Sequence, residues 1–244
     1  MMARTLATVM MVGLCASLVP AAPTAPPEND KTPRRLVYQN PSAVSPKVRV
    51  DGHVRATEDA VLTLTVLAPE RVGLTTKDQP SLYWFQSKPT TNRYELVITE
   101  KNAEKPLVEA RFKTAAGGVQ RAGLADFGVR LAEGVEYRWS VAIVLDPDNR
   151  SRDVVASGAI KRISSPEKLR QRLRGAPSTE LPYIYADEGV WYDSLEALCA
   201  LVDARPKDAK LHEIRAVYFM QVGLHDAALY DMQAAGRTSA NPPR

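Results

Sequence analysis

The sequence predicts an α+β protein in which an antiparallel β-sandwich is followed by a C-terminal helical region. Two observations support this fold class. Between Val61 and Ile163, apolar and polar side chains alternate, which is typical of strands with one buried and one solvated face. After the Ser-Ser-Pro segment at 164–166, the apolar residues recur at helical spacing instead. This change of period places the sandwich at 48–163 and the helical hairpin region at 164–236.

The sandwich is expected to contain about seven short strands. The clearest alternation lies in residues 62–66, 94–99, 108–113 and 136–145. Turn residues separate such runs at Asn102, Gly117-Gly118, Glu133-Gly134 and Asp146-Pro147. Trp84 and Trp139 stand on the predicted strands beside apolar neighbours, so we expect both in the core.

Tyr137 gives a more specific indication of the sandwich type. It follows the turn at Gly134 and opens the longest alternating run. A tyrosine in this position resembles the tyrosine corner of immunoglobulin-like and fibronectin type III sandwiches, whose hydroxyl group hydrogen-bonds to the backbone upstream. We therefore expect a sandwich of this kind, with a structural role for Tyr137.

The helical region is predicted to begin with a capped turn. Ser165 is expected to cap the first helix, with Pro166 as its first residue and Glu167 at the positive end of its dipole. Four further helices are expected, at about 179–188, 190–204, 208–222 and 225–236.

A repeat relates two of these hairpins. Gly189 and Gly223 lie 34 positions apart, and residues of similar kind surround both. This period is that of tetratricopeptide-like hairpins, which stack and present a surface to a partner. Two units rarely stand alone, so we expect the helices to pack against the sandwich. Trp191 and Tyr192 are candidates for the partner surface, and packing of the hairpin against its neighbour is the alternative.

Both ends of the chain are expected to lie outside the fold. Residues 1–21 are predicted to be a signal peptide, because Arg4 precedes an apolar stretch at 6–19 and small residues follow it. The stretch is shorter than the roughly 20 residues of a membrane-spanning helix. We therefore expect export to the periplasm or the cell exterior, without stable membrane insertion. The proline-rich residues 22–47 are predicted to form a disordered linker, and residues 237–244 a disordered tail.

Composition and motifs argue against several functions. The formal net charge is only +4, with basic residues interspersed among acids, which argues against nucleic-acid binding. Cys199, the one cysteine outside the predicted signal peptide, is expected to serve packing rather than chemistry. The histidines lack the spacing of metal ligands; they are His53, His212 and His225. No catalytic or nucleotide-binding string occurs, so we predict no enzymatic activity, metal or cofactor.

The densest polar cluster is a candidate binding loop between two long strands, an end of the sandwich where such folds carry binding loops. Its residues are Asp146, Asp148, Asn149, Arg150, Ser151, Arg152 and Asp153. Three acids and an amide are oxygen ligands that suit calcium, but the EF-hand pattern fails at Arg150 and Ser151. The structural alternative is an Asp-Pro turn in which the two arginines pair with Asp146 or Asp153.

A basic cluster lies after the sandwich. It comprises Lys161, Arg162, Lys168, Arg170, Arg172 and Arg174. Such a cluster can meet an anionic envelope surface. A solvated helix face is the alternative.

Several sequence strings occur together in a fixed order. They are Leu64-Thr-Val-Leu-Ala-Pro69-Glu70, Gly73-Leu-Thr-Thr76, Trp84-Phe85, Tyr137-Arg-Trp139, Asp146-Pro147, Gly158-Ala-Ile160 and Glu188-Gly-Val-Trp191-Tyr192-Asp193. Over about residues 60–230 the chain thereby resembles the bacterial family named domain of unknown function 928, DUF928. The resemblance implies an exported protein and brings no activity with it. Where that family often has Cys-Asp-Pro, this chain has Leu145, so a role for that thiol is not expected.

The leading hypothesis is a non-enzymatic envelope or periplasmic scaffold that binds another envelope or secreted protein. One alternative is a carbohydrate- or envelope-surface-binding module, which requires aromatic side chains on one open face. Strand alternation places most aromatics inward, which argues against it. Another alternative is a hydrolase that uses acids near Glu136 or Asp146, which requires carboxylates that converge in a cleft.

Overall fold

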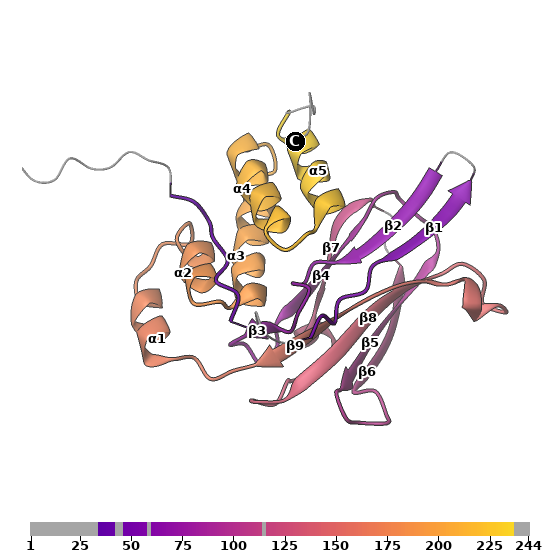
Figure 1. Cartoon of the computed structure of the whole chain (residues 1–244), viewed down its shortest axis with the longest axis horizontal. Coiled ribbons are helices and arrows are strands. Elements are labelled where there is room, and N and C mark those ends of the chain that lie inside the picture. Colours follow the sequence, from indigo (N-terminus) through magenta and orange to yellow (C-terminus); the bar gives the residue numbers. More distant parts are fainter. Residues whose placement is uncertain (1–33, 42–45, 58–59, 114–115, 237–244) are drawn as a thin grey trace, which may run out of the picture. The chain divides into compact units, whose positions relative to one another are not determined.

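The computed structural model describes residues 34–41, 46–57, 60–113 and 116–236 (Figure 1). The predicted signal peptide, the predicted tail and part of the predicted linker lie outside these residues. The described part of the chain forms nine strands in two sheets and five α-helices, so the fold is of the α+β class. The expected strand number was too low, because short strands such as the Gly-Leu-Thr strand at 73–75 are too brief to show an alternating pattern.

One sheet contains four antiparallel strands in the order β1-β2-β4-β7. These strands are β1 (Gly52–Thr57), β2 (Ala60–Val66), β4 (Ser81–Gln86) and β7 (Gly118–Gly123). Every residue of β4 is buried, so this strand is covered on both faces. A continuous apolar run of this kind is what two-sided burial requires.

The other sheet contains five strands in the order β3-β9-β8-β5-β6. They are β3 (Gly73–Thr75), β5 (Arg93–Glu100), β6 (Val108–Lys113), β8 (Glu136–Val144) and β9 (Val154–Arg162). All neighbours are antiparallel except β3 and β9, which run parallel. Along β5, the side chains of Tyr94, Leu96 and Ile98 are buried, and the residues between them are partly exposed. The outer face of β5 is therefore open.

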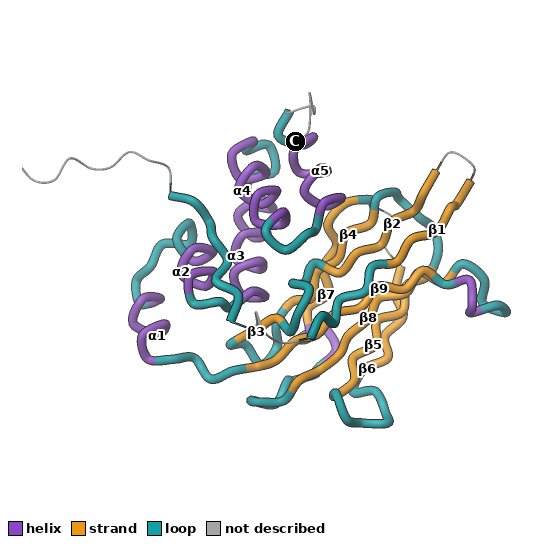
Figure 2. Tube along the Cα trace, in the orientation of Figure 1, coloured by secondary structure: helices purple, strands orange, loops and turns teal. Residues whose placement is uncertain are grey.

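The helices follow the sheets in the chain. They are α1 (Glu167–Leu173), α2 (Leu181–Asp187), α3 (Trp191–Ala204), α4 (Ala209–Met220) and α5 (His225–Ala234). Figure 2 shows them gathered on one side of the strands. Helix α3 contacts β3 and β4, and helix α5 contacts β7. These contacts explain why β4 is buried on both faces.

The helix boundaries differ slightly from those expected. Pro166 is the N-cap of α1, not its first residue, because its ψ of 149° is extended, and the cap has no side-chain hydrogen bond. The predicted capping by Ser165 was therefore wrong by one position. Gly189 and Gly223 follow α2 and α4 with φ of 71° and 72°. Glycine adopts this left-handed conformation without a steric cost, which gives the two glycines of the repeat the same local role.

The larger of two hydrophobic clusters among the described residues extends from the sheets into the helices. It includes Leu64 and Trp84 of the four-stranded sheet, Trp139 of β8, and Trp191 and Tyr218 of the helices. The predicted burial of Trp84 and Trp139 is confirmed. Because both halves contribute to one core, removing either would expose apolar surface of the other. Among the described residues, no helix is long and apolar enough to cross a membrane.

Tyr137 makes the backbone contact expected of it. The backbone N–H of Ala132 donates a hydrogen bond to its hydroxyl over 3.0 Å. The ring itself is buried, so the bond fixes the turn before β8 against the core. The predicted hydrogen bond to the upstream backbone is confirmed.

Part of the predicted disordered linker, residues 22–47, belongs to the fold. Leu36 and Tyr38 are buried, and the backbone N–H of Gln39 donates to the carbonyl of Ala186 over 3.1 Å. Residues 35–41 therefore pack on the helices. The proline content of this stretch hid the contact, because Leu36 and Tyr38 are too few apolar residues to form a recognisable pattern in the sequence.

Candidate functional site

The loop between β8 and β9 contains all seven residues of the predicted binding loop. A carboxylate oxygen of Asp146 accepts the backbone N–H of Asp148 over 3.0 Å, the Asx-turn contact expected after a strand. The hydroxyl of Ser151 donates to the side chain of Asn149 over 2.6 Å. Arg150–Arg152 then form a short 3-10 turn. The loop is thus a locally hydrogen-bonded turn.

Its two arginines pair with the acids at its ends. Arg150 contacts Asp153 over 2.7 Å, and Arg152 lies 3.7 Å from Asp146. These are the pairs of the structural alternative. The guanidinium groups occupy the carboxylates that calcium would need, and their charge would repel a cation. Among the described residues, no group of three or more His, Cys, Asp or Glu side chains could hold a metal ion.

Arg150 also reaches a residue that the sequence did not indicate. One of its terminal nitrogens lies 2.6 Å from Glu95 on the outer face of β5. The other oxygen of Glu95 accepts from Arg111 of β6 over 2.9 Å. Glu95 is thus clamped between two arginines, with 14% of its side chain exposed. The hydrogen bond from Arg150 holds the pKa of Glu95 below its ordinary value, and Arg111 acts in the same direction.

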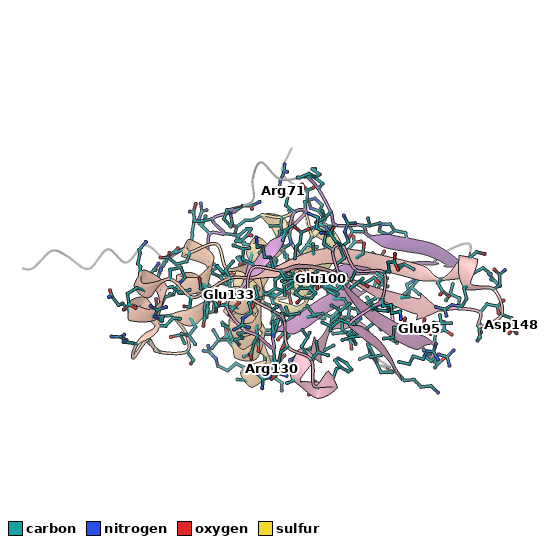
Figure 3. All side chains as sticks on the ribbon, turned by 90° about the horizontal axis from the view of Figure 1, so that it is seen from below. Arg71, Glu95, Glu100, Arg130, Glu133 and Asp148 are labelled. Carbon is teal, nitrogen blue, oxygen red and sulfur yellow. The ribbon has the colours of Figure 1, made fainter. Side chains whose placement is uncertain are left out.

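A shallow groove surrounds this clamp. It has a volume of about 250 Å³, and its lining residues are Glu95, Leu96, Val97, Glu109, Ala110, Arg111 and Arg150. The register of β5 and β6 pairs Glu95 with Arg111 and Val97 with Glu109, which brings these four side chains onto one face. In Figure 3, Glu95 and Asp148 lie toward the same end of the sheet. The groove therefore adjoins the predicted loop and shares Arg150 with it.

The groove is built for binding rather than for proton transfer. Glu95 is held ionised by its arginines, so its carboxylate is a weak base and cannot act as an acid near neutral pH. Within the described part of the chain, the terminal nitrogens of Arg111 make no hydrogen bond, and Glu109 forms no ion pair. These groups can donate to and accept from a polar ligand.

The acids named for a hydrolase do not converge. Glu136 begins β8, and Asp146 lies beyond the end of the same strand. At a rise of about 3.3 Å per residue they are roughly 30 Å apart, whereas carboxylate pairs of glycosidases lie about 5–10 Å apart. Glu136 is paired with Lys101 over 3.0 Å. These two acids cannot act on one bond.

Trp191 and Tyr192, the predicted partner surface, are not on the surface. Both side chains have an exposed fraction of 0%. The indole N–H of Trp191 donates to the carbonyl of Leu67 over 2.9 Å, and the hydroxyl of Tyr192 donates to the carbonyl of Ala159 over 3.0 Å. The packing alternative describes both as the chain is folded: Tyr192 contacts the sheet, and the ring of Trp191 is covered by the ring of Tyr38 at a centroid distance of 5.0 Å. Neither residue therefore forms the exposed partner surface that was predicted. The reason is that both residues lie at the N-terminal end of α3, and this end packs against the sheets.

The next two residues of α3 also hold this helix against the rest of the fold. The carboxylate of Asp193 accepts from the backbone N–H of Thr76 over 3.1 Å and from its hydroxyl over 2.9 Å. The hydroxyl of Ser194 donates to the carbonyl of Pro182 over 2.8 Å. Burial raises the pKa of Asp193, and hydrogen bonds from Thr75 and Thr76 act against this.

Leu67, Thr76 and Ala159 come from three of the strings behind the family resemblance, and all three bond to the string at 188–193 in a buried contact between α3 and the sheets. The role of these strings is structural, whereas Asp146-Pro147 lies apart from them in the loop after β8.

A buried ionic cluster between α4 and α5 was missing from the sequence interpretation. Arg215 makes two bonds of 2.7 Å to the carboxylate of Asp231. The ring of His212 lies 2.9 Å from Asp231 and 2.9 Å from the carbonyl of Pro206. Cys199 is adjacent, 3.6 Å from Arg215, and burial raises the pKa of its thiol to about 11. A thiol in this state is a poor nucleophile, in line with the packing role predicted for it.

The predicted basic cluster is largely neutralised by acids of α1 and α2. Lys168 lies 3.1 Å from Glu188, and Arg172 lies 2.7 Å from both Glu188 and Asp187. Arg170 and Arg174 pair with Glu167. This pairing supports the solvated-face alternative over an anionic surface.

Aromatic side chains do not form an open face. Among the described residues, Tyr230 is the only tyrosine, tryptophan or phenylalanine that is exposed, with an exposed fraction of 39%. Its ring packs against Phe85 at a centroid distance of 5.6 Å. A carbohydrate platform needs several exposed rings, which this surface lacks.

Three comparisons place the chain among known proteins. The family model described as Domain of Unknown Function (DUF928) matches residues 49–232. No curated protein matches it. Among solved structures, it is similar to one described as a multi-domain immunophilin from Arabidopsis thaliana, at 12% identity, covering 78% of this chain and 99% of that chain. The TM-score of that pair is 0.17, so the likeness carries no structural conclusion.

Proposed function

Because the chain belongs to the DUF928 family, whose description assigns no activity, we propose a function from its own surfaces: it is an exported, non-enzymatic module that binds another protein. Export rests on the predicted signal peptide at 1–21. The partner is another envelope or secreted protein, met in the periplasm or outside the cell. The docking surface is the groove between β5, β6 and the loop at 146–153.

The local architecture supports such a module. Two sheets and the bond between Ala132 and Tyr137 support an immunoglobulin-like sandwich. The matching left-handed glycines, Gly189 and Gly223, support tetratricopeptide-like hairpins. Both kinds of fold are common carriers of protein-binding surfaces, but the surface itself must be argued from its residues.

The observation that carries the proposal is the clamp of Glu95 between Arg111 and Arg150. The clamp holds both guanidinium groups at the groove while leaving N–H donors of Arg111 unused. Arginine is the side chain best suited to binding a carboxylate through paired N–H groups. Glu109 adds an acceptor at the other side of the groove for a basic residue of the partner. The groove therefore suits a polar polypeptide segment that carries a carboxylate.

The neighbouring strand edge offers a second contact for the same segment. Strand β6 is the last strand of its sheet, so one side of its backbone is unpaired within the described residues. An extended segment can add to such an edge through main-chain hydrogen bonds. The charged side chains of β6, at Glu109, Arg111 and Lys113, lie on one face of the strand and would select a partner that carries opposite charges at the facing positions.

Site-specific photo-crosslinking tests this function. A photoreactive residue replaces Glu109 in the groove, or the exposed Lys207 between α3 and α4 as a matched control. Irradiation in the producing cells should give a discrete protein adduct from position 109 only. Adding Arg111→Gln should remove this adduct, because it takes away the charged, paired N–H donors without setting a second carboxylate opposite Glu95. Equal adducts from both positions, or an adduct that persists with Arg111→Gln, would overturn the proposed surface.

A further inference from the structure

The chain's own residues 35–41 run as an extended peptide beside α2 and α3 (Figure 1). Arg35 begins the same compact unit that contains the sheets and helices. Leu36 and Tyr38 are buried at 4% and 8% exposure, and Val37 between them is exposed. This alternation is what a single bound strand shows when one of its faces enters a groove.

The helical region contacts the backbone of this segment through hydrogen bonds. The side-chain amide of Gln221, just after α4, accepts the N–H of Tyr38 over 2.8 Å and donates to the carbonyl of Leu36 over 2.8 Å. At the other side, the carbonyl of Ala186 accepts the N–H of Gln39 over 3.1 Å. These bonds require an extended main chain and are blind to side-chain identity.

Specificity comes from the pocket for Tyr38. The rings of Trp191 and Tyr218 stack at a centroid distance of 4.5 Å. The ring of Tyr38 meets them edge-on, at 5.0 Å from Trp191 and 6.3 Å from Tyr218. The Tyr38 hydroxyl is buried and has no hydrogen-bond partner among the described residues. The pocket therefore selects an aromatic ring and gains nothing from the hydroxyl group.

Gly189 leaves room for the segment. A Cβ atom at this position would lie 2.5 Å from the carbonyl oxygen of Gln39 and 2.8 Å from the ring of Pro41. Gly223 has nearly the same φ, but a Cβ atom there would meet only Arg49, at 3.7 Å. The two glycines thus share one backbone conformation, and only Gly189 faces the peptide.

We propose that the surface formed by Ala186, Gly189, Trp191, Tyr218 and Gln221 is a peptide-binding site for an extended partner segment with an aliphatic residue and, two positions later, an aromatic one. Residues 35–41 are its built-in occupant and compete with the partner. The occupant buries two side chains, a small area to hold a strand in place, so a partner segment can displace it at modest cost. This site is separate from the sheet groove and does not depend on it.

The test uses the full mature chain with a protease recognition sequence inserted between Pro41 and Pro46. Cleavage of the folded protein turns residues 35–41 into a non-covalent ligand. The probe is a fluorescent synthetic peptide of residues 35–41, whose exchange into the cleaved protein is followed by anisotropy. Near-UV circular dichroism reports whether the remaining chain stays folded. Size-exclusion chromatography reports its association state.

We expect saturable exchange of the peptide. A Tyr38→Phe peptide should bind at least as well, and a Tyr38→Ala peptide on the order of 10- to 100-fold more weakly, since it loses a buried aromatic ring. Gly189→Ala in the protein should weaken peptide binding, whereas Gly223→Ala, with the same backbone strain, should leave it unchanged.

Three results would overturn the proposal. The first is loss of the near-UV signal when the segment leaves, because residues 35–41 would then be part of the core. The second is equal binding of the Tyr38→Ala peptide, or no binding at all. The third is a dimer that excludes the peptide, because the groove would then belong to a second copy of the chain.

Discussion

The indole N–H of Trp139 donates a hydrogen bond to the hydroxyl of Tyr192 over 2.9 Å, which joins strand β8 to helix α3 inside the core. That hydroxyl in turn donates to the carbonyl of Ala159 on β9. One tyrosine oxygen therefore satisfies two buried polar groups of the sheet. Beside it, a Cβ atom at Gly73 would lie 2.7 Å from the ring of Tyr192, so β3 approaches the helix as closely as its backbone allows.

Removing this hydroxyl should weaken the joint without changing its shape. Tyr192→Phe leaves the indole N–H of Trp139 without its acceptor in the core and removes one donor to the carbonyl of Ala159. We expect the free energy of unfolding to fall by about 2 to 3 kcal/mol. Urea denaturation, followed by tryptophan fluorescence and far-UV circular dichroism, measures this change. Because the halves share one core, the two signals should change at the same urea concentration.

Tyr230→Phe is the matched control for loss of a tyrosine hydroxyl at a partly exposed site. This substitution should change the free energy of unfolding by no more than about 0.5 kcal/mol. Equal effects of the two substitutions would contradict a structural role for the Tyr192 hydroxyl. Two separate transitions would contradict a shared core.

Asp193 should make stability depend on pH. Burial raises its pKa above the ordinary value of 3.8, so the folded state holds a proton that the unfolded state has already lost. Its contribution to stability is therefore full below pH 3.8 and is lost as the pH rises through the raised folded value. Asp193→Asn removes this loss, and its amide can still meet both groups of Thr76. We expect the variant to gain stability relative to the unmodified protein as the pH rises from 3.8 toward neutral.

Urea titrations of both proteins at several pH values provide the measurement. Thr76→Ala serves as a control, because it removes one partner of the carboxylate and keeps the titrating group. Parallel stability curves for the Asp193→Asn and unmodified proteins would show that Asp193 has the same pKa in both states, against the expectation.

The sequence predicted local contacts of this fold better than distant ones. The bond from Ala132 to Tyr137 and the pair of Arg150 with Asp153 each join residues a few positions apart, and both could be read from a short motif. Glu95 lies 55 positions from Arg150, so the clamp that makes the groove left no local signal. The sequence indicated the loop but not the groove beside it.

The burial of Trp191 shows the same limit. Its hydrogen bond to Leu67 spans 124 positions, and nothing in the repeat says which face of α3 meets the sheets. The parallel pairing of β3 with β9 was equally hidden, since β3 contains only three residues. Helical and strand periods specify elements and their apolar faces, whereas the partner of each face is decided by packing across the whole chain.

Arg150 should control the ionisation of Glu95. Its hydrogen bond is the main cause of the lowered pKa of Glu95. Arg150→Ala should therefore raise the pKa of Glu95 toward the ordinary value of 4.5. Arg152 pairs with Asp146 instead, so Arg152→Ala should leave the pKa of Glu95 unchanged. Carbon-detected NMR titration of the Glu95 carboxyl group measures this pKa in each variant. An unchanged midpoint in the Arg150→Ala protein would mean that the clamp does not form in solution.

The pair of Arg215 and Asp231 should be the most sensitive site in the helical region. Asp231→Ala leaves the guanidinium of Arg215 buried without its two hydrogen bonds, at 4% exposure, and removes the partner of His212. Breaking a buried pair in this way typically costs about 3 to 5 kcal/mol. In the double variant Arg215→Met and Asp231→Ala the unpaired charge is gone, so the double change should destabilise the protein less than the sum of the single changes. Thermal and urea unfolding of the three variants measure the coupling, and strictly additive effects would show that the two side chains do not interact in the folded protein.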